Sequence, residues 1–334
     1  MGQEDTRVEL RALGRTGHRV SVLGFGCGAV GGLMVKGEPA EQHRAIQQAV
    51  DAGIRYFDTA PSYGNGRSEE NLGRVLQELG SRAADLVVGT KFRVEPGQAA
   101  GAGAAIRTSI EDSLRRLRRE RVHLLQLHTR IAARPGSGGL TPPEVLGPVL
   151  DGLHAVRDAG LAAHLGITAN GDTAAVLEVV NSGRIETGQV FFNAANPSAG
   201  WPGHRPPNGH DFSGLIDSAA AHSVGVIVIR PLAGGALAAS DVRHPNASAA
   251  PGGISGESYD ADLAHARSLA TLAAELGLEG PPELAVRFAQ AKPGVSTVLV
   301  GYSDSGQLAD AIRWTERGPL SPDAVQRVLA ATPR

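Results

Sequence analysis

The sequence predicts an α/β fold of the (β/α)8 barrel type, and three observations lead to it. Short apolar runs rich in Val, Ile and Leu alternate with longer amphipathic segments, as in strand–helix units around a parallel sheet. The alternation occurs eight times within 334 residues, and eight parallel strands close into a barrel more readily than they remain an open sheet. Several apolar runs also end at a polar side chain, and barrels carry their functional groups at the carboxyl ends of the strands.

The predicted strands are short and apolar, as strands buried on both faces are. They cover residues 22–26, 55–58, 86–91, 122–128, 163–168, 189–192, 226–229 and 297–300. The predicted helices cover residues 39–52, 67–79, 104–117, 142–159, 173–181, 214–222, 259–276 and 305–314. Four of these helices are followed by glycine, the residue preferred at a helix C-terminus, at positions 53, 80, 160 and 277.

The two ends of the chain carry additional elements. Residues 8–13 and 18–22 alternate in polarity around a four-residue turn, so residues of about 8–22 are expected to form a β-hairpin that closes the bottom of the barrel. A tail helix is expected at about 320–331. Together these elements predict one barrel domain over residues 1–334. Long loops at 129–140, 194–212 and 231–258 each follow a strand and are expected on the rim that carries function.

A doubly wound parallel sheet with a second domain is the alternative fold. It requires a Gly-x-Gly-x-x-Gly turn after the first strand. Gly24 and Gly26 have the first spacing, but the third glycine would fall at position 29, which is Ala29. The barrel is therefore favoured.

The amino-acid composition limits the kinds of binding partner that we expect. The chain has 32 Lys and Arg against 34 Asp and Glu, and its formal charge of -2 predicts no electrostatic attraction to nucleic acid or to a membrane surface. Its one cysteine, Cys27, excludes an intrachain disulfide and a cysteine-based metal cage, and no metal site is predicted. The first ten residues are charged, and no apolar run reaches the ~18–20 residues of a membrane span. We expect a cytoplasmic protein with a small-molecule partner.

Four polar residues follow the first strands and form the predicted catalytic site. Asp58 and Tyr63 lie in the run FDTAPSYG, Lys91 ends VVGTK, and His128 ends LLQLH. A tyrosine has a pKa near 10, so it needs a neighbouring ammonium to favour its phenolate, and a carboxylate keeps that ammonium charged. A histidine can orient a carbonyl and relay a proton. None of these groups is a redox agent, so hydride must come from a nicotinamide cofactor.

Each residue also has a structural explanation, as a helix cap, a packing aromatic or a solvated strand end. A different chemistry also stays open, in which Lys91 is the nucleophile of a Schiff-base aldolase or isomerase. Asp58 argues against it because a neighbouring carboxylate keeps the amine charged.

The run GIRYFDTAPSYG at 53–64 resembles the first signature of the aldo-keto reductase family, and the helix after it continues the likeness. Lys91 and His128 fall at the family's other catalytic positions, and the resemblance extends from the hairpin to about Trp314. It implies a barrel that reduces aldehydes or ketones to alcohols with NADPH, with Tyr63 as general acid. Some members are instead cofactor-sensing regulatory subunits, which is the second alternative.

The resemblance also implies residues that hold the nicotinamide. Thr168 and Gln189 stand where the family binds the carboxamide, but Ala169 replaces its asparagine, with Asn170 one place later. Ile229 stands where the family often stacks a tyrosine, so an aliphatic contact is expected there.

The remaining cofactor contacts are expected at the pyrophosphate and the adenosine. The segment after the seventh strand resembles the pyrophosphate loop, with Arg230, Leu232, Gly234 and Gly235. The segment after the eighth strand, with Gly301, Ser303 and Gln307, resembles the adenosine site. It has no basic residue for a 2′-phosphate, and Asp304 would repel one, so Ser303, Ser305 and the following helix N-terminus are the expected binders. NADP is the predicted cofactor and NAD the alternative.

The predicted substrate contacts lie on the rim loops, at Thr129, Trp201 and His204, with Arg130 and Arg230 also near the pocket mouth. The sequence predicts a small carbonyl or alcohol substrate. It predicts neither its identity nor the direction of the reaction nor the oligomeric state.

Overall fold

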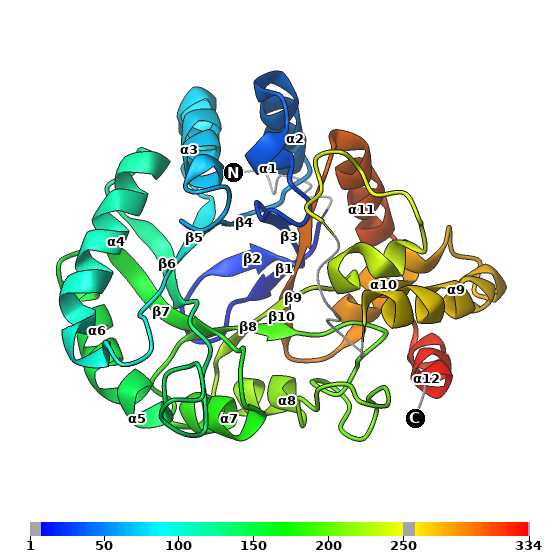
Figure 1. The fold of residues 1–334 in the computed structure, drawn as a ribbon. Coiled ribbons are helices and arrows are strands. Elements are labelled where there is room, and N and C mark those ends of the chain that lie inside the picture. The colour runs from blue at the N-terminus through cyan, green and yellow to red at the C-terminus, as the bar shows by residue number, and fades with distance from the viewer. Residues whose placement is uncertain (1–7, 250–257, 333–334) are drawn as a thin grey trace.

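Eight parallel strands close into a barrel in the computed structural model, which describes residues 8–249 and 258–332 (Figure 1). The strands follow one another around the barrel in the order β10-β3-β4-β5-β6-β7-β8-β9. The predicted fold is confirmed, and the doubly wound open sheet is excluded because β10 pairs with β3 and closes the ring. The charged residues 1–7, part of the segment judged not to be a secretory signal, lie outside the described residues.

The barrel strands lie within two residues of their predicted bounds. They are β3 (Leu23–Gly26), β4 (Tyr56–Asp58), β5 (Val87–Phe92), β6 (Val122–Leu127), β7 (Ala162–Thr168), β8 (Thr187–Phe191), β9 (Gly225–Ile229) and β10 (Val295–Gly301). The α-helices are α1 (Leu33–Lys36), α2 (Pro39–Asp51), α3 (Arg67–Leu79), α4 (Ala102–Leu117), α5 (Pro142–Glu144), α6 (Leu150–Asp158), α7 (Thr173–Asn181), α8 (Leu215–Ala221), α9 (Tyr259–Glu275), α10 (Pro281–Ala291), α11 (Ser305–Glu316) and α12 (Pro322–Ala331). None of the helices in the described ranges is long and apolar enough to cross a membrane.

Two helical predictions need correction. The helix expected over 142–159 is broken into α5, a wide turn over Val145–Val149 and α6. Pro148 lies in that turn and supplies no backbone N–H, and Gly147 before it has non-helical angles (φ -103°, ψ -109°). Helices α1 and α10 were not predicted, and α10 begins at Pro281-Pro282. Both prolines occupy the first turn, where a backbone N–H has no helical partner.

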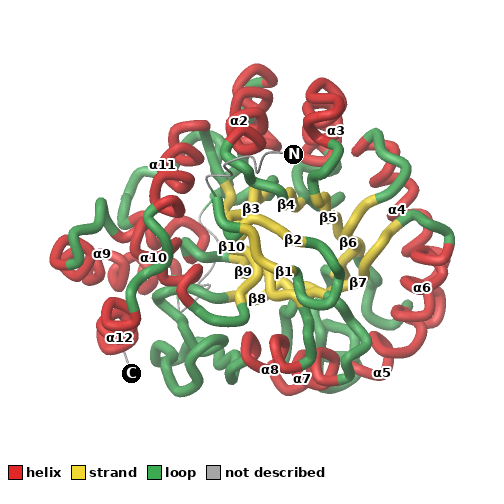
Figure 2. The backbone as a smooth tube through the Cα atoms, turned by 180° about the vertical axis from the view of Figure 1, so that it is seen from behind, coloured by secondary structure: helices red, strands yellow, loops and turns green. Residues whose placement is uncertain are grey.

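The N-terminal hairpin closes the bottom of the barrel as predicted. Strands β1 (Leu10–Ala12) and β2 (Arg19–Ser21) pair antiparallel across the barrel end (Figure 2). Leu13 and Val20 are fully buried among apolar side chains inside the barrel, including Leu124 of β6. Gly14 has φ 51°, and a side chain there would collide with the backbone of Gly225 at the start of β9. The hairpin therefore seals the end opposite the functional rim.

Three imidazoles meet at this closed end. The ring of His18 lies 5.2 Å from those of His123 and His164, edge to face in both cases. Nδ1 of His123 accepts a hydrogen bond from the Val88 N–H, at 3.1 Å. Burial, together with charge repulsion from His18, Arg119, Arg121 and His164, lowers the pKa of His123 to about 4. His123 therefore stays neutral in the folded protein.

We expect the protein to lose stability as pH falls from about 6.5 towards 4. In that window the unfolded chain protonates at His123 and the folded chain does not, so the unfolded state gains protons and the free energy of unfolding decreases. The loss from His123 should be about 1–2 kcal/mol after solvent screening. Urea unfolding at several pH values measures it. His123→Asn, whose Oδ1 can accept from Val88, should flatten the slope, whereas His154→Asn should not. Equal slopes in all three proteins would contradict the prediction.

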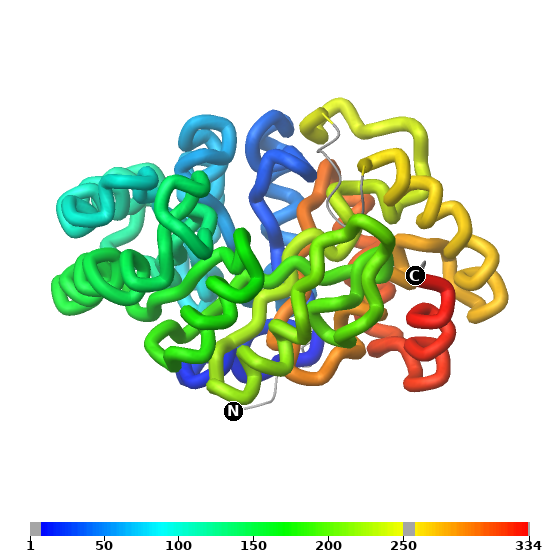
Figure 3. Tube along the Cα trace, turned by 60° about the horizontal axis from the view of Figure 1, so that its bottom comes forward, coloured from blue at the N-terminus to red at the C-terminus, as the bar shows by residue number. Residues whose placement is uncertain are grey.

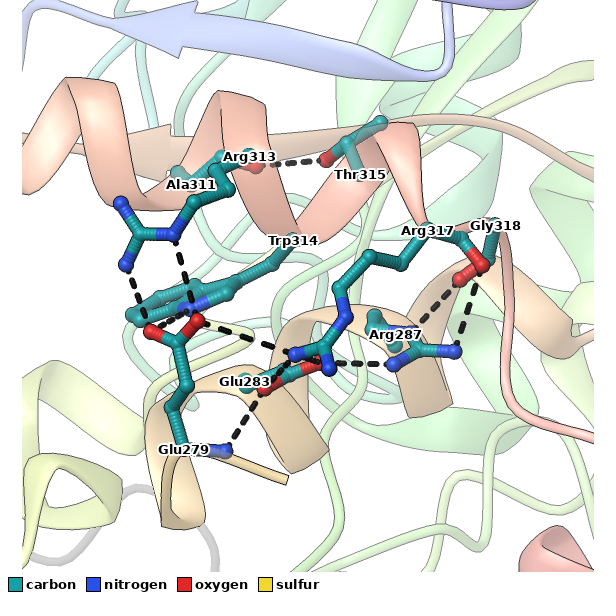
Figure 4. A network of polar contacts seen from close by, with 9 residues as sticks. All are labelled: Glu279, Glu283, Arg287, Ala311, Arg313, Trp314, Thr315, Arg317 and Gly318. Carbon is teal, nitrogen blue, oxygen red and sulfur yellow. Dashed lines mark hydrogen bonds and ion pairs between the residues drawn. The ribbon is translucent and has the colours of Figure 1, made fainter. Parts of the chain in front are cut away.

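An ion-pair network holds α10 against α11 (Figure 4). The buried carboxylate of Glu283 accepts from Arg287 and Arg317, at 2.6 and 2.8 Å. Glu279 accepts from the indole N–H of Trp314 at 2.9 Å and pairs with Arg313. Since Glu283 is fully buried, these bonds satisfy a charge that would otherwise oppose folding. The network fixes α11, which contributes to the cavity described next.

Candidate active site

The carboxyl ends of β4, β5 and β6 bring three of the four predicted catalytic side chains to one rim. Asp58 is the last residue of β4 and pairs in register with Gly89 of β5. Lys91 lies two residues beyond Gly89 on β5, opposite Gln126 of β6, and His128 follows β6 directly. Tyr63 comes from the loop after β4. Parallel strands in register make this convergence unavoidable.

Asp58 and Lys91 form a buried ion pair beneath the rim. Their side chains are 2% and 1% exposed, and Lys91 Nζ also donates to the Thr59 carbonyl at 2.8 Å. The same ammonium lies 4.8 Å from the ring centroid of Tyr63. Burial by itself would lower the pKa of Lys91, but Asp58 and Tyr63 outweigh it and raise that pKa above its usual value. Lys91 is therefore a fixed positive charge next to the phenol.

Two further residues fix the carboxylate of Asp58 from inside the barrel. Its Oδ1 accepts from the Tyr56 hydroxyl at 2.9 Å and from the Gln189 amide at 2.6 Å. Burial, with the charge of Asp58, raises the pKa of Tyr56 well above its usual value, so Tyr56 stays a neutral donor. Tyr56 was missed from the sequence. Tyr56 precedes Asp58 by two residues on one strand, and this spacing places both side chains on the same face, so their contact could have been predicted.

His128 faces Tyr63 with its ring perpendicular to the phenol, at a centroid distance of 6.1 Å. Burial lowers the pKa of His128 to about 3, with added repulsion from Lys91, Arg93 and Arg230. The imidazole is therefore neutral at physiological pH. It can donate or accept a hydrogen bond, but it is not an imidazolium acid. We therefore expect His128 to orient the substrate carbonyl and not to act as the proton donor.

A cavity of about 590 Å³ opens above this group. Asp58, Tyr63 and His128 line one end of it, and Lys91 lies beneath the lining. Ten residues expected to contact the cofactor line the same cavity: Thr168, Gln189, Ile229, Arg230, Leu232, Gly234, Gly235, Gly301, Ser303 and Gln307. They come from the ends of β7 to β10 and from α11, so the cavity continues from the catalytic rim to the α10–α11 corner, where Trp314 lies. Ser305, expected at the 2′-phosphate, is not part of the lining, and its backbone N–H donates to Glu41 at 2.9 Å.

A family model of the Aldo/keto reductase family matches residues 22–332. The chain belongs to this family. L-galactose dehydrogenase of Arabidopsis thaliana is 28% identical over 310 residues, which cover 92% of this chain and 88% of that protein. A probable voltage-gated potassium channel subunit beta of Oryza sativa subsp. japonica is 26% identical over 338 residues, covering 97% and 96%.

The fold has a counterpart among solved structures. The holo form of an aldo-keto reductase from Bacillus halodurans matches with a TM-score of 0.72 at 23% identity, covering 97% of this chain and 96% of that one. At this identity the likeness concerns the fold. Aldo/keto reductases bind nicotinamide cofactors.

The three residues expected to contact the substrate are not among those that line this cavity. The Thr129 hydroxyl is bound to the backbone N–H and C=O of Val94, at 3.0 and 2.9 Å. Trp201 packs against Phe192 and Phe288, with ring centroids 5.6 and 5.1 Å away. His204 donates its backbone N–H to Trp201. Within the described residues, Thr129, Trp201 and His204 do not line the cavity.

Asn170 enters the cavity instead, and it was not among the expected contacts. Its backbone N–H bonds to the Thr168 carbonyl at 2.7 Å, a tight turn that spans only Ala169. Ala169 is buried, while Thr168 and Asn170 both line the cavity. Asn170 therefore supplies a side-chain amide in the cavity lining next to Ala169, which has none.

The loop after β9 adds two basic residues, Arg243 and His244, that also line the cavity. Arg243 donates to the Tyr259 hydroxyl at 2.8 Å, and His244 lies 3.5 Å from Asp304. The loop is fixed beside the segment around α1 (Figures 1 and 3). Ser248 N–H bonds to the Ala29 carbonyl at 3.1 Å, and the Asn246 amide bonds to the Ser303 carbonyl at 3.0 Å. Residues 301–307 contain no basic residue, and these two basic residues reach the same cavity from a loop some sixty residues earlier.

Proposed function

We propose that this aldo/keto reductase uses NADPH to reduce an aldehyde or ketone to an alcohol, or catalyses the reverse reaction, with Tyr63 as general acid or base. One observation carries the proposal. The Tyr63 phenol lies at the cavity end between the buried Lys91 ammonium and the neutral ring of His128.

The chemistry of the chain's own residues follows from their charges. Tyr63 gives its proton to the carbonyl oxygen of a substrate. The Lys91 ammonium, held charged by Asp58, stabilises the phenolate that remains. Neutral His128 donates a hydrogen bond to the same oxygen and orients it. The nicotinamide, when bound, supplies the hydride.

The cavity suits a dinucleotide. Its volume is within the range of about 300–1,000 Å³ usual for ligand pockets. Thr168, Asn170 and Gln189 offer hydroxyl and amide groups for a carboxamide near the catalytic end. Gly234 and Gly235, at φ 69° and 104°, let the backbone approach a pyrophosphate without side chains. Ser303, Gln307 and the indole of Trp314 are available for the adenosine.

Preference for NADP over NAD is proposed to depend on Arg243 and His244. We expect Arg243→Met to lower kcat/KM for NADPH about 10- to 100-fold more than for NADH, because only the former carries a 2′-phosphate to bind the guanidinium. Steady-state kinetics with both nucleotides measures this ratio. Arg267→Met removes an exposed arginine paired with Asp241 and is the matched control. If kcat/KM falls equally for NADPH and NADH, Arg243 does not bind the 2′-phosphate and only stabilises Tyr259 and the loop.

Two alternatives remain to be tested. A Schiff-base enzyme needs a neutral amine, whereas Lys91 carries a raised pKa and a buried counter-ion. A regulatory role is suggested by the potassium channel beta subunit relative. Following NADPH oxidation across a panel of aldehydes and ketones tests the proposal. Turnover with at least one of them supports an oxidoreductase. Nucleotide binding without turnover favours a sensor, and borohydride trapping of a lysine adduct without nucleotide favours the Schiff-base chemistry.

A further inference from the structure

Arg230 is a positively charged residue at the cavity that has no role in the proposed catalytic mechanism. It follows β9 directly, lines the cavity, and is half-buried. Its Nη1 is fully buried, and within residues 8–249 and 258–332 this atom has no hydrogen-bond partner. No carboxylate of the described residues forms an ion pair with it. By contrast, the nearby rim arginine Arg130 is paired with Asp172.

A buried guanidinium nitrogen without an acceptor, such as Nη1, is unfavourable, because its desolvation is not offset by hydrogen bonds. Burial lowers the pKa of Arg230, partly opposed by Tyr63, but an arginine stays charged. An anion from outside the chain would satisfy it.

The side chain belongs to the catalytic end of the cavity. Tyr63 is the group whose charge acts on Arg230, and Arg230 in turn helps to lower the pKa of His128. Both residues flank the position proposed for the substrate carbonyl. Arg230 directly follows Ile229, which ends β9 in register with Phe191 of β8, so it stands on the same rim of the barrel and in the same cavity as Tyr63 and His128.

The backbone presents this side chain at some conformational cost. Arg230 has φ 58°, a left-handed conformation that is uncommon for a residue with a Cβ. Its carbonyl accepts from the Asn193 amide at 3.0 Å and from the Ala233 N–H at 2.9 Å, and these bonds hold the turn. Backbone strain that the surroundings maintain is typical of functional positions.

We propose that Arg230 binds an anionic group of the substrate, a carboxylate or a phosphate, so that the preferred substrates are carbonyl compounds that carry such a charge. The guanidinium offers two parallel N–H donors to either oxyanion. This assignment rests on the proposed reductase function and names its substrate class. The sequence analysis expected Arg230 to contact the cofactor, and this proposal assigns it to the substrate instead.

Matched pairs of aldehydes test the proposal in the complete protein with NADPH. The three carboxybenzaldehydes are compared with their carboxamides, and glyceraldehyde 3-phosphate with glyceraldehyde. We expect kcat/KM for at least one charged member to exceed that of its neutral partner. In Arg230→Gln this ratio should fall at least about 30-fold, since removing one partner of a buried charge pair costs that much or more. Arg230→Lys should restore part of it, and Arg267→Gln, at an exposed arginine paired with Asp241, should leave the ratio as in the wild type.

The outcomes separate the inference from the proposed function. Absence of turnover with every aldehyde would refute the reductase function itself. Turnover of neutral aldehydes with no preference for any charged partner overturns the role of Arg230, and this result needs only the wild-type protein. Equal losses for charged and neutral substrates in Arg230→Gln, together with weaker NADPH binding, would assign the residue to the cofactor pyrophosphate. A shifted pH profile with equal losses would assign it to tuning Tyr63. Either result overturns the proposal.

Discussion

Replacing Tyr63 by phenylalanine should reduce kcat for carbonyl reduction by about 100- to 10,000-fold. The substitution removes only the hydroxyl that is proposed to protonate the carbonyl oxygen. The ring stays 4.8 Å from Lys91 Nζ and beside His128, so the packing of the site is conserved. Single-turnover measurements with saturating NADPH would report the chemical step, and quenching of protein fluorescence would report nucleotide binding, which should change little.

Tyr302→Phe is the matched control for the loss of one hydroxyl. Tyr302 is buried, and its hydroxyl has no hydrogen-bond partner among the described residues. This variant should keep turnover within a few-fold of the wild type. If Tyr63→Phe behaves in the same way, another group supplies the proton and the proposed mechanism fails.

Replacing Lys91 by methionine should lower the free energy of unfolding by about 3–5 kcal/mol and abolish measurable turnover. Methionine keeps much of the length and volume of lysine but leaves the buried carboxylate of Asp58 without its ammonium. Tyr56 and Gln189 still donate to Asp58 Oδ1, but they do not neutralise its charge. Urea unfolding, with circular dichroism as the signal, measures the stability change at neutral pH.

The double variant Asp58→Asn/Lys91→Met separates folding from catalysis. Both charges are then absent, so about half or more of the lost stability should return. Turnover should not return, because the phenolate of Tyr63 still lacks its cation. Recovery of turnover along with stability would mean that Lys91 serves the fold alone.

The sequence by itself determined the barrel and predicted which polar side chains meet at its rim, for local reasons. Runs such as VVGTK and LLQLH carry their own strand signal, and each ends at the polar residue that reaches the rim. Because parallel strands in register place their carboxyl ends together, identifying Lys91 and His128 as strand ends is enough to predict that they meet. The contact of Tyr56 with Asp58 could also have been predicted, because residues two apart on a strand point to the same face.

Only the tertiary structure decided which loop residues reach the cavity. Trp201 and His204 were expected at the pocket because their loop follows a strand, yet the loop folds against Phe192 and Phe288. Arg243 and His244 come to the cavity through hydrogen bonds between segments far apart in the chain. Asn170 and Arg230 depend on a tight turn and on one positive φ angle. Strand ends follow from local periodicity, whereas the course of a loop is set by long-range packing and by a few backbone angles that composition does not encode.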